Sequence, residues 1–300
     1  MAALGEERPR EPGAEADLRP RAIAGLALGE ARRLCGGPYR LQRGILVAVE
    51  GIDGAGVSTT AEALARVLDS MLEAGGACYT KEPTYGPVGF LIWQALSGGY
   101  MEPLRLPQML GLLFAADRLW HLTAEAIQGA RGVLGCLARP AVVVSDRYKY
   151  SSLAYQQVSG LVADRRIPGA PREWLEAINS YAPPAHFLVY VDVPVEVALS
   201  RVEGERWVLH LYERRAYLEE VRRRFEDLLD SLAGRPEAPA RAPWAALLEA
   251  WGLDPSEAYP GGGYPILLRL DGTGSPVENV ARAACGILRV ASERGLVSSL

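Results

Sequence analysis

The sequence has no apolar run that approaches the roughly 20 residues of a membrane-spanning helix. The one misleading stretch, residues 22–29, is short and is followed at once by charged residues, so we expect an amphipathic helix there and not a signal sequence. Positive charge is also in deficit, with 32 Lys and Arg against 36 Asp and Glu. This balance argues against a nucleic-acid backbone as the main partner. We therefore expect neither a membrane nor a nucleic-acid partner.

Cysteine is scarce as well, and no two cysteines form a CxxC pair. The four are Cys35, Cys78, Cys136 and Cys285. Their wide spacing indicates neither a zinc site nor a disulfide framework. We interpret all four as reduced, buried thiols in a cytoplasmic protein.

What is present is the composition of a globular protein, with 49% hydrophobic and 23% charged residues. Short β-branched runs predict strands, and longer stretches with apolar residues at helical spacing predict helices. The expected strands are residues 44–50, 76–80, 141–145, 187–191 and 265–270, and the expected helices are residues 58–74, 107–128, 195–201 and from about 277. This alternation predicts an α/β fold with a parallel β-sheet, helices on both faces and a ligand site where the strands end.

The domain organisation follows from the same patterns. Residues 1–40 have little periodicity and read as an N-terminal extension that is partly disordered. Residues 41–300 read as one domain, with an insertion rich in Pro, Ala and Gly at about 233–263.

A glycine-rich turn follows the first expected strand and opens a helix, which is the context of the GxxxxGK[ST] phosphate-binding pattern. In such a loop, successive backbone N–H groups and the helix N-terminus face a bound phosphate. The residues assigned to this loop are Gly51, Ile52, Asp53, Gly54, Ala55, Gly56, Val57, Ser58 and Thr59. Ser58 stands where a hydroxyl would bind Mg²⁺.

The loop departs from the pattern at one position. Val57 replaces the lysine that normally contacts the β- and γ-phosphates. Two alternatives stay open beside a working kinase loop: a turn that binds no ligand, and a loop that binds phosphate but transfers it poorly.

Several further motifs, in order along the chain, resemble the thymidylate kinase family. The loop resembles the family's EGIDGAGKST stretch except at Val57, and Thr80-Lys81-Glu82-Pro83 resembles its TREP segment. Residues 112–118 are similar to its LLFAADR helix, residues 145–156 to its DRY and SSxAYQ run, and residues 191–201 to its LDVPPEVALxR turn. The resemblance covers residues 46 to about 225 and implies a P-loop NTPase fold with a small lid.

The resemblance also implies roles for particular residues. Phe114 would stack on the acceptor base, and Arg118 would reach the carbonyl edge of that base. Glu82, Arg147, Tyr155 and Gln156 would complete the acceptor site, with Arg147 gripping the acceptor phosphate. Asp146 would hold Mg²⁺ through water. Each of these residues could instead have a purely structural role.

A lid would lie after the helix that ends near Arg201, where arginines are frequent. We take Arg201 and Arg206 as lid residues, and Asp53, Arg147 and Arg206 as the catalytic residues. Lysine occurs only at Lys81 and Lys149. Because the loop has no lysine, we predict that one of these lysines or a lid arginine points at the donor phosphates.

The resulting hypothesis is a nucleoside monophosphate kinase that transfers the γ-phosphoryl group of ATP to dTMP with Mg²⁺, giving dTDP. One alternative is a weak or inactive paralogue that binds nucleotide and regulates a partner. Another is a kinase of a different nucleoside monophosphate. The resemblance also implies a possible homodimer.

Overall fold

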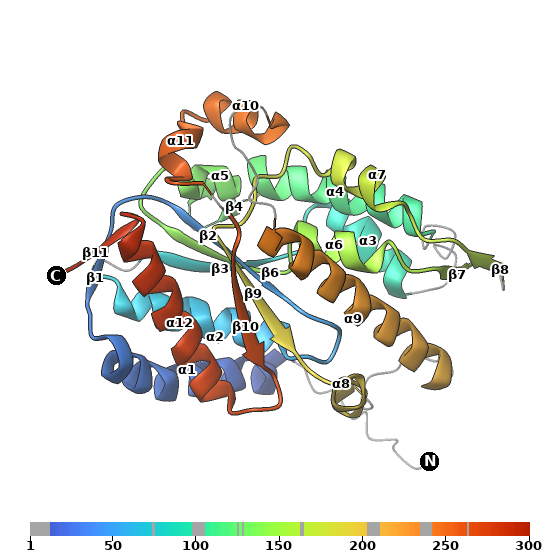
Figure 1. Ribbon diagram of the computed structural model, residues 1–300, viewed down its shortest axis with the longest axis horizontal. Coiled ribbons are helices and arrows are strands. Elements are labelled where there is room, and N and C mark those ends of the chain that lie inside the picture. The colour runs from blue at the N-terminus through green and yellow to red at the C-terminus, as the bar shows by residue number, and fades with distance from the viewer. Residues whose placement is uncertain are drawn as a thin grey trace, which may run out of the picture.

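The centre of the computed structural model is a sheet of five parallel strands in the order β10-β9-β2-β6-β3 (Figure 1). The strands are β2 (Ile45–Glu50), β3 (Ala77–Lys81), β6 (Val142–Asp146), β9 (Phe187–Asp192) and β10 (Ile266–Asp271). The structure describes residues 13–73, 76–97, 106–124, 126–127, 129–162, 165–202, 211–234, 242–262 and 264–300. The predicted parallel α/β fold is confirmed, and each of the five expected strands lies within one or two residues of its predicted bounds.

Helices cover both faces of this sheet. One face carries α2 and α12, with α1 packed outside them; the other carries α4, α5, α6, α7 and α9 (Figure 1). The helices of the first face are α1 (Gly13–Cys35), α2 (Val57–Met71) and α12 (Pro276–Glu293). Those of the second face are α4 (Pro107–Thr123), α5 (Gly132–Leu137), α6 (Lys149–Tyr155), α7 (Arg172–Ile178) and α9 (Leu211–Gly234). Two further helices pack on these, α3 (Pro87–Ser97) on α4 and α8 (Val195–Val202) on α9. In the described part of the chain, no helix is long and apolar enough to span a membrane.

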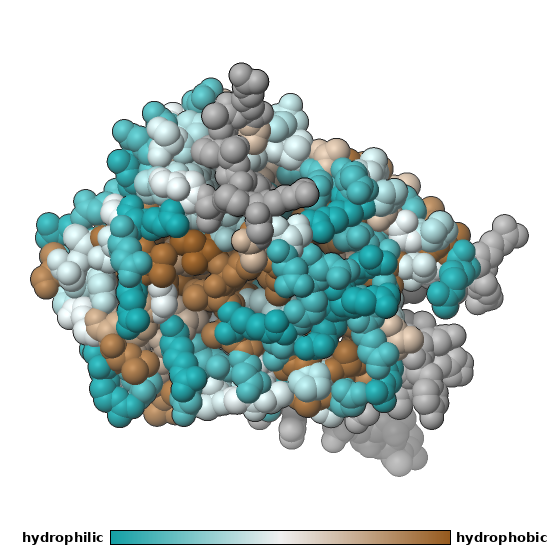
Figure 2. Space-filling model, in the orientation of Figure 1, coloured by the Kyte–Doolittle hydropathy of each residue, from teal (hydrophilic) through white to brown (hydrophobic). Residues whose placement is uncertain are grey.

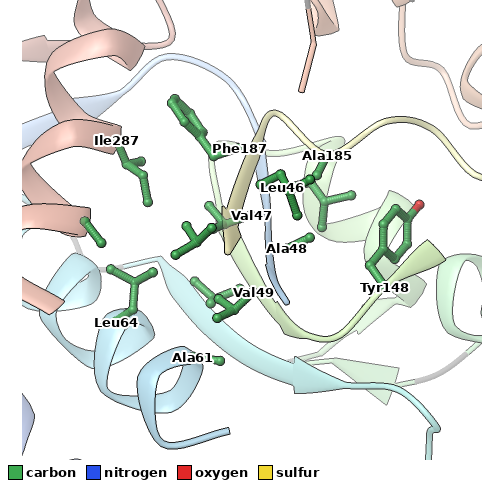
Figure 3. Close-up of a cluster of buried hydrophobic side chains, with 14 of the residues drawn as sticks. Leu46, Val47, Ala48, Val49, Ala61, Leu64, Tyr148, Ala185, Phe187 and Ile287 are labelled. Atoms are coloured by element: carbon green, nitrogen blue, oxygen red, sulfur yellow. The ribbon is translucent and has the colours of Figure 1, made fainter. Parts of the chain in front are cut away.

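The central strand β2 shows how the sheet is buried on both sides. Its six residues are all buried, as expected for a parallel strand between helix layers. Because alternate side chains of a strand point to opposite faces, Val47 and Val49 lie toward Leu64 and Ile287, while Leu46 lies on the other face (Figure 3). The outward surface of α9, in contrast, is covered by hydrophilic residues (Figure 2).

Strand β1 (Tyr39–Leu41), which follows α1, pairs with β11 (Val297–Ser299) near the C-terminus in a small antiparallel sheet. Two further hairpins are formed by β4 (Ala126–Ile127) with β5 (Ala130–Arg131), and by β7 (Gly160–Val162) with β8 (Arg165–Ile167). In the predicted insertion, α10 (Pro243–Ala250) and α11 (Pro255–Ala258) bring Trp244 and Tyr259 into the aromatic cluster around His186.

The cysteines correct one prediction. Cys35 at the end of α1 and Cys285 in α12 form a disulfide, with their Cα atoms 5.7 Å apart, so they are not reduced thiols. The pairing joins residues 250 positions apart in the sequence, which spacing alone cannot reveal. Cys78 and Cys136 are free and buried, as predicted.

The helix predicted over residues 107–128 is also too long. α4 ends at Thr123, and the β4–β5 hairpin begins at Ala126. Gly129 in the turn of this hairpin has φ of 75°, a left-handed conformation that favours glycine.

Candidate active site

The glycine-rich loop lies between the carboxyl end of β2 and the start of α2. Gly54 and Gly56 have φ of 83° and 91°, in the left-handed region that favours glycine. Gly51 has no room for a side chain, because a Cβ atom there would lie 2.8 Å from the carbonyl oxygen of Val191. A turn hydrogen bond from the Ala55 N–H to the Ile52 carbonyl measures 3.0 Å. The glycines are therefore required by the shape of the loop.

Val57, at the lysine position, is the first residue of α2 and is buried in the core. Its Cγ2 would lie 3.1 Å from a Cβ on Gly51, so the side chain is tucked beneath the loop. Ser58 is exposed and Thr59 is partly exposed at the helix N-terminus. This end of the helix thus offers backbone N–H groups and hydroxyls, but no cationic side chain.

Arg147 joins the phosphate loop to the residues after β6. Its Nη1 donates to the Gly51 carbonyl at 2.8 Å, and its Nη2 donates to Asp53 Oδ1 at 2.6 Å. The guanidinium also lies over the ring of Tyr155, 5.3 Å from its centroid. Burial alone would lower the pKa of Arg147. Electrostatic interactions with Tyr155, Asp53 and Asp146 have the larger effect and raise it. Arg147 has φ of 67°, the one positive value among the described residues other than glycine. Such strain is typical of functional positions.

The Tyr155 hydroxyl also contacts the loop, since it accepts a 2.9 Å hydrogen bond from the Asp53 N–H. The ring is held by an edge-on contact with Phe225 of α9, 6.1 Å between centroids. The predicted residues Asp53, Arg147 and Tyr155 therefore meet at one point.

Glu50 is a site residue that the sequence reasoning did not single out. It ends β2, is fully buried, and accepts hydrogen bonds from the Tyr148 N–H at 2.8 Å and the Ser151 N–H at 3.2 Å. Burial raises the pKa of Glu50 to about 7, although Arg147 and Ser151 act in the opposite direction. A carboxylate that closes an otherwise apolar strand directly before the glycine loop was the available signal.

Asp146 ends β6, the strand next to β2, and is buried. The Tyr79 hydroxyl donates to its Oδ2 at 3.1 Å. Among the described residues, no three His, Cys, Asp or Glu side chains group together as metal ligands. Asp146 and the Ser58 hydroxyl nevertheless suit Mg²⁺, which takes few protein oxygens and completes its shell with water and substrate phosphates.

A second group of polar side chains surrounds Arg118 on α4. The Arg118 Nη2 donates to Glu82 Oε2 at 2.6 Å and to the Ser152 hydroxyl at 3.3 Å, and Nη1 donates to Asn179 Oδ1. All four residues are buried. The Nε atom of Arg118 has no partner in the described part of the chain. Asn179 was not foreseen, because nothing in the sequence connects α4 with the residue that follows α7.

Glu82 is held from a second side by His121. The His121 Nδ1 lies 3.0 Å from Glu82 Oε1, and its Nε2 lies 2.8 Å from the Thr80 hydroxyl. Glu82 is therefore fixed between Arg118 and His121. Its main role is to hold the guanidinium of Arg118 in position.

The remaining acceptor-side candidates lie on α4 and after α6. Phe114 is half-buried, one helical turn before Arg118. Gln156 is buried, and among the described residues its Oε1 has no hydrogen-bond partner. An unpaired buried acceptor is costly, so a ligand donor is its natural partner.

The candidate substitutes for the loop lysine lie in different places. The Lys81 ammonium is over the rings of Tyr85 and Trp93, at 4.4 and 5.2 Å, and Lys149 Nζ donates to the Ala182 carbonyl at 3.1 Å. Arg201 does reach the loop: it donates to the Ala55 carbonyl at 3.4 Å and to the Gly272 carbonyl at 2.9 Å. Arg206 lies outside the described residues.

Comparison with known proteins identifies the family of this chain. Residues 49–235 match the family model described as thymidylate kinase. A protein of Aeropyrum pernix is 42% identical over 61% of this chain and 78% of its own length. One of Treponema pallidum is 35% identical over 61% of this chain and 77% of its own length; both bear the name "Putative thymidylate kinase". A Methanococcus aeolicus protein named "Probable thymidylate kinase" is 30% identical over 64% of this chain and 82% of its own length. The chain belongs to the thymidylate kinase family.

Proposed function

We propose that this chain transfers the γ-phosphoryl group of ATP to dTMP, forming ADP and dTDP. The observation that carries the proposal is the position of Arg147, which contacts Gly51 and Asp53 of the phosphate loop and the ring of Tyr155. A guanidinium at this junction can neutralise the acceptor phosphate while the transferred group passes from the loop.

On the donor side, the N–H groups of the loop and of the α2 N-terminus hold the phosphates. Val57 supplies no positive charge to the loop. Arg201, which contacts the carbonyls of Ala55 and Gly272, supplies this charge in place of the missing lysine. The Ser58 hydroxyl and the Asp146 carboxylate would hold a bound Mg²⁺, which would supply further charge neutralisation. Arg206 remains a second candidate in the lid.

On the acceptor side, Arg118 and Gln156 supply a donor and an acceptor whose unpaired atoms are both buried. Such a pair suits a base edge that presents both a carbonyl and an N–H. Phe114 is available to stack on the ring. A base that left the polar atoms of Arg118 and Gln156 unpaired would bind weakly. These two residues therefore determine which base the acceptor site selects.

Transfer needs no covalent enzyme intermediate. An oxygen of the acceptor phosphate attacks the γ-phosphorus, the bond to the β-phosphate oxygen breaks, and ADP leaves. Orientation and neutralisation of charge by the loop, Arg147 and Arg201 supply the catalysis.

The test is a panel of nucleoside monophosphates incubated with the full chain, ATP and Mg²⁺, with the diphosphate products separated by anion-exchange chromatography. The same panel is run with Val57→Lys. Wild-type turnover that prefers dTMP supports the proposal. Turnover that prefers another monophosphate refutes the assigned acceptor. No wild-type turnover on any acceptor, with activity only in Val57→Lys, refutes the claim that the lysine-free loop is active.

We also propose that the chain acts as a homodimer in the cytoplasm, where ATP and dTMP are supplied, with nucleotides and no nucleic acid as partners. Exposed apolar side chains on α3, on α4 and just before α3 support the dimer: Phe90 is 59%, Leu112 49% and Tyr85 78% exposed. Light scattering should give twice the chain mass, and a Phe90→Glu and Leu112→Glu double variant should give the single mass. Leu26→Glu, on the surface of α1, is the control that should stay dimeric.

A further inference from the structure

The turn that carries Arg147 is held by its neighbours at several points. The Arg147 N–H donates to the Val49 carbonyl at 3.0 Å, and the Ser145 hydroxyl donates to the Arg147 carbonyl at 2.6 Å. The next residue, Tyr148, donates its N–H to Glu50 Oε1 at 2.8 Å. These bonds hold Arg147 at its φ of 67°, a conformation that persists only where the surrounding structure imposes it. The backbone of Arg147 is therefore fixed by the fold itself.

The Ser151 hydroxyl links this turn to the Arg147 side chain. It accepts a 3.0 Å hydrogen bond from Arg147 Nη1 and donates its own hydrogen to Glu50 Oε2. Glu50 is fully buried, so its carboxylate is a fixed acceptor for that hydrogen. A hydroxyl has one hydrogen and two lone pairs. Because Glu50 takes the hydrogen, the lone pairs of Ser151 are left for the guanidinium.

The partners of the guanidinium leave some of its N–H groups for a ligand. Nη1 donates to the Gly51 carbonyl and to Ser151, which uses both of its hydrogens. Nη2 donates one hydrogen to Asp53. Within the described part of the chain, the hydrogen bonds of this guanidinium use neither the Nε–H nor the second hydrogen of Nη2. The side chain is 21% exposed, so these two donors can reach the oxygens of a phosphate.

The link to Arg147 is separate from the backbone contacts at the start of α6. Glu50 Oε1 accepts the N–H groups of Tyr148 and Ser151, the latter at 3.2 Å. A variant that lacks only the Ser151 hydroxyl keeps both of these bonds. Its effect should therefore fall on the guanidinium of Arg147 and not on the helix.

We propose that Ser151 is a positioning residue for phosphoryl transfer, a role that rests on the proposed kinase function. Its hydroxyl, oriented by Glu50, holds the Arg147 guanidinium so that the remaining donors face the acceptor phosphate. Ser151 acts through Arg147 and does not touch the substrate. Without the hydroxyl, Nη1 loses one of its two acceptors, and the guanidinium can turn about its side-chain bonds. Fewer of its conformations then meet the phosphate in the productive geometry.

The experiment is a double-mutant cycle on the full chain, with wild type, Ser151→Ala, Arg147→Lys and the variant that carries both changes. Steady-state rates of dTDP formation are measured with ATP and dTMP each varied in turn. Ser151→Ala should lower kcat/KM for dTMP about tenfold and leave KM for ATP within about twofold. In the Arg147→Lys background, the same change should have less than about a twofold effect, because the guanidinium on which Ser151 acts is gone.

Two further variants serve as controls. Ser151→Thr keeps the hydroxyl and should retain most of the wild-type kcat/KM. Ser292→Ala removes an exposed hydroxyl near the end of α12 and should leave kcat/KM unchanged. Equal losses from Ser151→Ala in the two Arg147 backgrounds would overturn the proposal, and so would a loss of the same size in Ser151→Thr.

Binding of dTMP to the same four proteins, measured by calorimetry, separates this proposal from the kinase activity. If the wild-type chain binds dTMP but forms no dTDP, the proposed function fails, and the positioning role is read from the affinities. A loss of affinity in Ser151→Ala that disappears in the Arg147→Lys background supports it. Additive losses, or a wild-type chain that does not bind dTMP, would overturn it.

Discussion

The guanidinium of Arg118 and the carboxylate of Glu82 form an ion pair of 2.6 Å in which both side chains are only 2% exposed. Removing one partner of such a pair leaves the other charge buried and uncompensated. Asn179 and Ser152 accept hydrogen bonds from the same guanidinium, so the three partners together fix the position of Arg118, which we propose contacts the acceptor.

We therefore expect Glu82→Gln to destabilise the protein by about 3–5 kcal/mol. Chemical denaturation should show this as a lower midpoint at unchanged slope. The matched control is Glu62→Gln, which breaks the Glu62–Arg66 pair on the surface of α2 and should cost no more than ~0.5 kcal/mol. Equal effects of the two variants would contradict the assigned role of the buried pair.

Asn179 should act through Arg118 and not on the phosphates. Asn179→Ala frees one arm of the guanidinium, so KM for dTMP should rise about tenfold, while KM for ATP stays within about twofold. Steady-state kinetics with each substrate varied in turn give both constants. Equal increases in both KM values would indicate general loosening of the fold and would count against a positioning role.

Arg147 should be sensitive to a change that keeps its charge. Lysine at this position cannot bridge the Gly51 carbonyl and Asp53 at once. We expect Arg147→Lys to lower kcat by about 10²–10³, whereas Arg172→Lys on α7, far along the chain from the loop, should leave it unchanged. Near-normal kcat in Arg147→Lys would remove Arg147 from the catalytic set.

Glu50 predicts a pH dependence of stability. Its folded pKa of about 7 lies above the ordinary value of 4.5, so the folded state keeps a proton that the unfolded state has lost between these values. Its contribution is thus fully present below about pH 4.5 and is lost as the pH rises through about 7. The loss is on the order of 3 kcal/mol. The difference in unfolding free energy between wild type and Glu50→Gln, measured from pH 4.5 to 8, should change by this amount. A difference that stays constant over this range would be inconsistent with a buried, protonated Glu50.

The Cys35–Cys285 disulfide should stabilise the chain because it closes a loop of 250 residues. The Cys35→Ala and Cys285→Ala double variant should lose about 2–4 kcal/mol of unfolding free energy. Denaturation of both proteins without reductant measures the loss, and wild type with dithiothreitol should approach the variant. No difference between them would mean that the bond does not constrain the unfolded chain.

Local patterns predicted the elements that depend on local physics. The strand that ends at Glu50, the glycine loop and α2 follow from a β-branched run, from glycines and from apolar residues at helical spacing. A glycine with positive φ is required wherever the backbone must wrap a phosphate, so Gly54 and Gly56 could be placed from the sequence.

Contacts between distant segments were out of reach of those patterns. The Cys35–Cys285 bond, the meeting of Asn179 with Arg118 and the contact of Arg201 with Ala55 all join residues that only the folded chain brings together. The apolar periodicity of α4 also continues beyond Thr123, where the helix ends. The β4–β5 hairpin that follows has Gly129 as its main signal in the sequence.

The central claim is that a thymidylate kinase loop with valine at the lysine position still transfers phosphoryl groups, with Arg201 supplying the missing charge. Its most direct measurement is the steady-state rate of dTDP formation from ATP and dTMP by the wild-type chain and by Arg201→Ala. Arg215→Ala, which removes an exposed arginine paired with Glu219, serves as the control. We predict turnover by wild type and control, and a loss of at least about tenfold in kcat/KM for ATP in Arg201→Ala. Wild-type turnover that Arg201→Ala leaves unchanged, or no dTDP from the wild-type chain, would contradict the claim.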